Sequence, residues 1–107
     1  MLPKINRIKK KKDFEVIFKK AKSFKNNLFI LKAIKNNLEV NRFGFVVSLK
    51  VSKKATVRNK IRRRMSEAVK TENIKPGVDV VLVALPQTTK ADFKAVKTGI
   101  IDILKNV

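Results

Sequence analysis

The sequence contains no cysteine, histidine, tryptophan or tyrosine. Without cysteine and histidine, a disulfide framework, a zinc knuckle, a thiol nucleophile and an imidazole general base are all excluded. Acidic residues number only 8 among 107, and they are scattered singly, so no carboxylate pair or metal cage is apparent. We therefore expect no self-sufficient active site and assign no metal ligands to the protein.

Long hydrophobic runs are also missing. The apolar runs at 43–51 and 78–85 have the length of strands and fall far below the roughly 20 residues of a membrane-spanning helix. Residues 1–14 lack the apolar stretch of a secretory signal, so we expect a cytoplasmic location. The length and the absence of a linker predict one domain over residues 1–107, in which 1–12 form a basic N-terminal arm.

Positive charge, in contrast, is present in large excess. The chain has 27 Lys and Arg against 8 Asp and Glu, a formal net charge of +19. Residues 1–22 carry nine basic and two acidic residues, and residues 50–64 carry eight basic residues and no acid. Such a field attracts polyanions and makes binding fall with salt. Nucleic acid is the leading candidate partner, and an anionic membrane surface is the second.

The apolar pattern predicts a helix and then strands in the first half of the chain. A helix is predicted over 13–21, because Asp13 is a candidate N-cap and apolar residues follow at helical spacing. These apolar residues are Phe14, Ile17, Phe18 and Ala21. A strand and hairpin are predicted over 24–34, with a turn at Asn36–Asn37 before the next segment.

A second strand and a second helix follow. Alternation from Arg42 to Val51 predicts a strand with one packed face. The packed face comprises Phe43, Phe45, Val47, Leu49 and Val51, and the other comprises Gly44, Val46, Ser48 and Lys50. Thr56 is a candidate cap for the helix after it. The apolar stripe of that helix is Val57, Ile61, Met65, Ala68 and Val69.

The last third predicts a strand and a helix. The nearly continuous apolar run at 78–85 is typical of a central strand covered on both faces. Thr89 and Asp92 resemble a capping box for a final helix. Its apolar residues are Phe93, Val96, Ile100 and Ile103 or Leu104. The order helix, three strands, helix, strand, helix predicts an α+β fold, an α/β sandwich in which three helices cover a small mixed sheet of about four strands with one face partly open.

The second predicted helix is the most basic element. On a helical wheel Asn59, Arg63 and Ser66 lie opposite its apolar stripe, flanked by Lys60 and Arg62. Guanidinium groups match phosphate oxygens, and an asparagine amide can donate to phosphate or ribose. Because no acid occurs from Lys50 to Arg64 to neutralise these cations, we favour RNA binding over a merely solvated helix face.

Several motifs follow one another along almost the whole chain. They are Asn6-Arg7-Ile8-Lys9-Lys10, Asp13-Phe14 with Phe18, Phe43-Gly44-Phe45-Val46-Val47-Ser48, Lys53-Lys54-Ala55, Arg58-Asn59-Lys60-Ile61-Arg62-Arg63 and Asp79-Val80-Val81-Leu82-Val83-Ala84. In this order they resemble the signature of bacterial ribonuclease P proteins. The resemblance implies a subunit that binds the catalytic ribonuclease P RNA and helps it remove the 5′ leader from precursor tRNA, with magnesium-dependent hydrolysis belonging to the RNA. No membrane contact and no protein partner are predicted.

The resemblance also implies roles for individual residues. Contacts with the RNA subunit are expected at Arg58, Asn59, Lys60, Arg62 and Arg63. A leader cleft between the first helix and the sheet is expected at Phe14, Phe18, Val46, Ser48 and Lys50. Further RNA contacts are expected at Arg7, Lys9, Lys10, Lys53 and Lys54.

Three positions depart from the family pattern. Lys60 keeps the charge of the arginine common there but lacks its planar fork, and Leu49 stands where many relatives have lysine. Lys32 stands where some relatives have an aromatic residue, which favours a phosphate contact over base stacking. The preference for leader sequence is therefore expected to differ.

Two other interpretations remain open at this point. A ribosomal or RNA-chaperone protein would have the same basic composition. A membrane-surface protein would use the lysine run at 9–12. Footprinting on RNA separates the first alternative from the leading hypothesis, and vesicle binding separates the second.

Overall fold

The computed structural model describes residues 2–70 and 74–107; Met1, the first residue of the predicted arm, lies outside the described residues. Its elements are η1 (Lys4–Asn6), α1 (Lys11–Lys20), β1 (Lys22–Lys25), β2 (Phe29–Lys35), β3 (Arg42–Val46), α2 (Ala55–Lys70), β4 (Val78–Ala84), η2 (Pro86–Lys90) and α3 (Phe93–Leu104). The predicted order of helices and strands and the α+β class are confirmed.

The four strands form one mixed sheet in the order β1-β2-β4-β3. β1 pairs with β2 and β2 with β4 in antiparallel fashion, whereas β3 and β4 run parallel. The predicted central strand is confirmed, because β4 lies between two others and Val80, Val81 and Leu82 are fully buried. β3 is an edge strand, and the N-terminal arm reaches it through an isolated bridge between Arg7 and Phe43.

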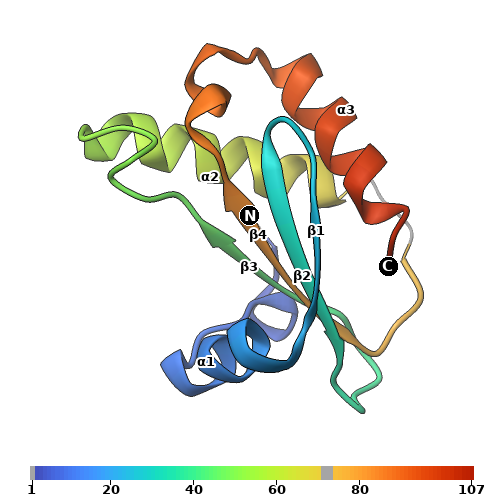
Figure 1. The fold of residues 1–107 in the computed structure, drawn as a ribbon. Helices are drawn as coiled ribbons and strands as arrows, with labels where there is room; N and C mark the ends of the chain where they lie inside the picture. The colour runs from blue at the N-terminus through green and yellow to red at the C-terminus, as the bar shows by residue number, and fades with distance from the viewer. Residues whose placement is uncertain (1, 71–73) are drawn as a thin grey trace.

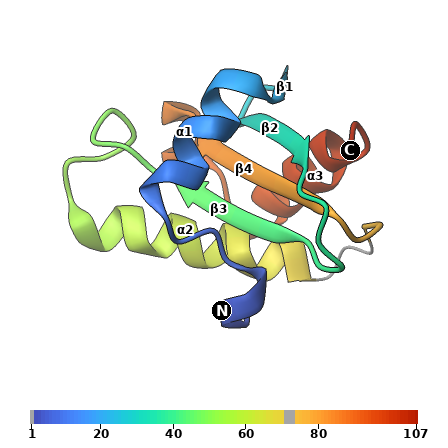
Figure 2. The ribbon, with the colours of Figure 1, turned by 90° about the horizontal axis from the view of Figure 1, so that it is seen from below.

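The helices cover the two faces of the sheet unequally (Figures 1 and 2). α2 and α3 pack together on one face, where Phe29, Met65 and Ile100 belong to the main core. α1 lies on the other face, where Ile17 and Val81 form part of a smaller core. Since one short helix covers only part of that face, the predicted partly open side of the sheet is the side of α1.

Two turns shape the first half of the sheet. The predicted hairpin over 24–34 is made of β1 and β2, and the Asn26 side chain accepts hydrogen bonds from the backbone N–H groups of Leu28 and Phe29 at 3.0 and 2.9 Å. The turn at Asn36–Asn37 is confirmed by a positive φ of 58° at Asn37. It does not join neighbouring strands, because β4 is inserted between β2 and β3.

The predicted strand over 42–51 is too long. β3 ends at Val46, the last residue of its register with β4. The chain then turns, with the Val51 N–H donating to the Ser48 carbonyl at 3.0 Å. Leu49, predicted to be packed, is 66% exposed. The alternation of apolar residues continues in the sequence beyond Val46, where the pairing of β3 with β4 ends.

The predicted N-termini of the helices were partly wrong. α1 has Lys10 at its N-cap position, so Asp13 lies within the first turn, and Thr56 likewise lies inside α2. Asp92, and not a Thr89 capping box, caps α3 by accepting from the Ala95 N–H at 2.8 Å. The Phe93 side chain, predicted on the apolar face of this helix, is 42% exposed.

Candidate nucleic-acid interface

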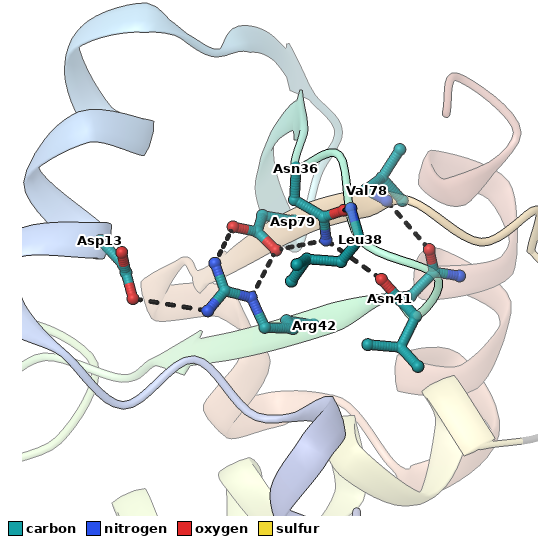
Figure 3. A network of polar contacts seen from close by, with 8 residues as sticks. Asp13, Asn36, Leu38, Asn41, Arg42, Val78 and Asp79 are labelled. Atoms are coloured by element: carbon teal, nitrogen blue, oxygen red, sulfur yellow. Dashed lines mark hydrogen bonds and ion pairs between the residues drawn. The ribbon is translucent and has the colours of Figure 1, made fainter.

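A polar network fixes the end of the sheet beneath α1 (Figure 3). The Arg42 guanidinium donates two hydrogen bonds to the Asp79 carboxylate, at 2.9 and 2.6 Å, and Asn36 donates a third at 2.8 Å. The hydrogen bonds to Asp79 raise the pKa of Arg42 above its ordinary value. Arg42 also lies 3.5 Å from the Asp13 carboxylate, so the network links β3 and β4 to the first turn of α1.

Phe14 rests directly on β3. A Cβ atom on Gly44 would lie 2.6 Å from Cε1 of the Phe14 ring, a distance that real Cβ atoms do not adopt. The glycine therefore lets the ring approach the strand backbone. Phe14 is partly buried against the smaller core, so it has a packing role and does not stand free in a cleft.

Phe18, one turn further along α1, is much more accessible. Its side chain is 44% exposed, and the Lys32 ammonium lies 5.7 Å from the ring centroid. This distance is within the range of a cation–π contact. Lys32, one of the three positions that depart from the pattern of the resembled family, thus contacts the exposed ring of Phe18 on α1.

A row of partly buried apolar side chains crosses three strands beside this pair. Ile30 is paired with Val83, and Val83 with Val46, and all three are only partly buried. Since alternate residues share a face, Ile30 lies on the same side as Lys32, toward α1. We call Phe18, Lys32, Ile30, Val83 and Val46 the open face.

The structure brings together three of the five predicted cleft residues. Phe14 and Phe18 project from α1, and Val46 of β3 packs with Phe14 against the smaller core. Ser48 and Lys50 were predicted on the strand and are instead in the exposed turn after it, where the Lys50 N–H donates to the Ser48 hydroxyl at 3.3 Å. The cause is the early end of β3 at its last pair with β4.

α2 contains most of the basic segment 50–64. Its apolar stripe is confirmed, since Ile61, Met65, Ala68 and Val69 are buried. Arg62 donates a hydrogen bond to the Asn59 side-chain oxygen on the outer face of the helix. The Arg58 guanidinium donates to the Ser52 carbonyl at 3.0 Å and so faces the loop before the helix.

The remaining predicted cations of this region are exposed. They are Lys53 and Lys54 in the loop, and Lys60 and Arg63 on the helix. Within residues 2–70 and 74–107, Lys60 and Arg63 make no hydrogen bond or ion pair with another side chain. Their charges remain available to a partner.

Ser66 was predicted on the outer face of α2 and is buried, 7% exposed. This side of the helix faces the N-terminal arm and the edge of β3 (Figure 2). The periodicity within α2 could not reveal a contact with a segment almost sixty residues earlier. The partial burial of Arg7 was missed for the same reason, whereas Lys9 and Lys10 are exposed as expected.

The arm is therefore packed against the domain. Leu2 and Ile8 are 9% and 6% exposed, and the Ile8 N–H donates to the Phe43 carbonyl at 2.9 Å. The two lysines that end the predicted arm, Lys11 and Lys12, already belong to α1. A clue was present in the sequence, because apolar residues at positions 2, 5 and 8 are interspersed among the basic ones.

Two absences concern the part of the chain that the structure describes. Across 2–70 and 74–107, no three acidic side chains gather closely enough to hold a metal ion. Over the same residues, no helix combines the length and the apolar character needed to cross a membrane.

Together the fold and the two basic segments, 1–22 and 50–64, define a small, strongly basic α+β protein whose most basic helix, α2, packs on the face of the sheet opposite to the partly open one. The ribonuclease P family model matches residues 2–107. The chain is 35% identical over 105 residues to the ribonuclease P protein component of Alkaliphilus oremlandii, covering 96% of this chain and 91% of that protein. The chain belongs to the ribonuclease P protein family.

Solved structures agree with this assignment. The RNase P protein from Thermotoga maritima is 32% identical, with a TM-score of 0.86, and the match covers 94% of this chain and 96% of that chain. The Staphylococcus aureus RNase P protein is 30% identical, with a TM-score of 0.86 and 94% coverage of both chains. The mixed four-stranded sheet with its three α-helices is therefore the fold of this family.

Proposed function

We propose that the chain is the RNA-binding subunit of ribonuclease P, which binds the catalytic RNA through α2 and the 5′ leader of precursor tRNA on the open face. The observation that carries the proposal is the acid-free basic segment 50–64, which includes the first part of α2, in a member of this family. The protein would act by binding, and the hydrolysis of the leader would take place on the RNA.

The chemistry of α2 suits a folded RNA. Arg62 is held by Asn59, so its guanidinium is partly ordered before binding, and Arg63 and Lys60 extend into solvent. Ordered guanidinium groups bind phosphate oxygens in a bidentate manner at a lower entropic cost. Arg58 adds a cation at the start of the helix, beside Lys53 and Lys54.

The open face suits a single strand. An unpaired nucleotide offers a ring that can stack on Phe18 and a phosphate that can pair with Lys32. The row of Ile30, Val83 and Val46 supplies apolar area beside them. Precursor tRNA has a single-stranded leader and mature tRNA does not, so this face would distinguish substrate from product.

Magnesium belongs to the RNA in this proposal. The described residues contain no cluster of carboxylates that fits a divalent cation. Phosphate and carbonyl oxygens of the RNA are suitable magnesium ligands. The contribution of the chain would be to neutralise the surrounding phosphates with its excess positive charge.

The test of the α2 surface is the salt dependence of binding to a bacterial ribonuclease P RNA. The double variant Arg62→Ala with Arg63→Ala should bind more weakly, and its plot of log affinity against log salt should be flatter by about 1.4 to 1.8, because each lost phosphate contact contributes about 0.7 to 0.9. Lys94→Ala with Lys105→Ala removes the same charge from exposed positions at α3 and just beyond its end, and should change the slope much less. Equal slopes for both double variants would reject α2 as the binding surface.

A further inference from the structure

A small pocket lies at the outer edge of β3, between the N-terminal arm, α1 and α2. It has a volume of about 200 Å³. Leu2, Ile8 and Phe14 supply apolar walls, and Arg7, Arg62 and Arg63 also line the pocket. Drug-sized ligands occupy pockets of roughly 300–1,000 Å³, so this pocket suits a single small ring system.

The edge of β3 offers the pocket one backbone donor and one acceptor that have no hydrogen-bond partner among residues 2–70 and 74–107. The Phe43 carbonyl accepts from Ile8 on the outer edge of the strand. Because the backbone groups of alternate residues point to the same side, the N–H and C=O of Phe45 also point outward. The bridge to the arm ends at Phe43, and Phe45 lines the pocket.

Arg7 adds a donor without an acceptor. Its Nε is buried and has no hydrogen-bond partner in the described part of the chain. A buried donor is costly unless a partner supplies an acceptor. The bridge to Phe43 holds the Arg7 backbone at the edge of β3, next to the pocket that this residue lines.

We propose that this pocket receives one unpaired nucleobase of an RNA whose flanking phosphates bind Arg62 and Arg63. A base has apolar ring faces and carries donors and acceptors on its edge, which match the ring of Phe14, the backbone of Phe45 and Nε of Arg7. A phosphate alone would not use the apolar walls, and the described lining contains no acid that would repel an RNA. The inference rests on the proposed function, because it assigns a ligand to the side of α2 that faces the arm.

The test uses a nine-residue oligouridylate that carries one photoreactive 4-thiouridine. In the wild-type chain, cross-links are expected on the segment 43–45 or on Arg7, mapped by mass spectrometry. Ser66→Leu fills the pocket from α2, since Ser66 is buried and lines it. These cross-links should disappear, and affinity for the oligouridylate should fall about fivefold or more, the effect of losing one stacked base.

Two control variants separate pocket filling from general damage. Thr98→Leu adds similar apolar bulk at an exposed position of α3 and should change neither cross-links nor affinity. Arg7→Lys keeps the charge and removes the Nε donor, so it should also weaken the cross-links, whereas Arg64→Lys, next to Ala91, should not. Circular dichroism and thermal unfolding establish that each variant folds, and if Ser66→Leu does not, Arg7→Lys decides the question.

The outcomes distinguish this inference from the function on which it rests. Absence of wild-type cross-links at the pocket, or their persistence in Ser66→Leu, would overturn the inference. If Ser66→Leu weakened binding of inorganic polyphosphate as much as that of oligouridylate, the pocket would be a phosphate site, and the base assignment would be wrong. A wild-type chain that cross-links at the pocket but does not bind ribonuclease P RNA would leave the pocket standing and reject the proposed function.

Discussion

Lys32 gives the sharpest quantitative prediction for the open face. Its ammonium lies 5.7 Å from the Phe18 ring centroid, where it can pair with the phosphate of a nucleotide stacked on that ring. A cation that neutralises one phosphate of a single strand contributes about 0.7 to the slope of log affinity against log salt. The Lys32→Gln variant should therefore lose roughly fivefold in affinity for precursor tRNA at about 0.1 M salt, and only about twofold at about 0.3 M.

The assay measures binding of precursor and mature tRNA to the complex of the chain with a bacterial ribonuclease P RNA across this salt range. The difference between the two slopes reports the leader, and it should fall by about 0.7 in Lys32→Gln. Lys35→Gln is the matched control, because Lys35 is exposed at the end of the same strand and alternation places it on the opposite face. The reasoning is refuted if the slope difference is unchanged in Lys32→Gln, or if the control lowers it equally.

Three further predictions concern the rings and the polar network. Phe18→Ala should weaken precursor tRNA binding about 5- to 150-fold, the effect of roughly 1–3 kcal/mol of stacking, and leave mature tRNA binding unchanged in the same titrations. Gly44→Ala should lower the free energy of unfolding by about 1–3 kcal/mol, measured in urea, because its Cβ would displace Phe14; an unchanged midpoint would contradict this close approach. Asp79→Asn should cost about 1.5–3 kcal/mol in the same assay, because it removes the charged hydrogen-bond acceptor of Arg42 and leaves that guanidinium only its 3.5 Å contact with Asp13; a loss below about 1 kcal/mol would mean that water replaces the carboxylate.

Periodicity within single elements predicted much of this fold. The stripe of Ile61, Met65, Ala68 and Val69 and the buried run of β4 were identified because one residue spacing determines which side chains meet the core. The same reasoning failed where an element ended. Leu49 continues the apolar alternation of β3 but is exposed, because the pairing of β3 with β4 stops at Val46. The spacing of apolar residues in one strand does not indicate where its pairing with a neighbouring strand ends.

Contacts between distant segments were the least accessible to sequence reasoning. Arg42 and Asp79 are 37 residues apart, and the sequence around each of them does not predict that the two form a bidentate ion pair. Ser66 is polar, so its burial depends on the arm folding back over α2, and the approach of Phe14 to Gly44 joins two motifs that were noted separately. The candidate site was predicted as a set of residues, whereas its division between an open face and an edge pocket required the three-dimensional arrangement.

The most direct test of the central claim is reconstitution of tRNA processing. The purified chain would be added to a bacterial ribonuclease P RNA at low magnesium and near-physiological salt, and cleavage of a precursor tRNA would be followed. We predict cleavage at the mature 5′ end when chain and RNA are both present, and none with either alone. Binding of the chain to that RNA without any stimulation of cleavage would contradict the account and favour a general RNA-binding protein.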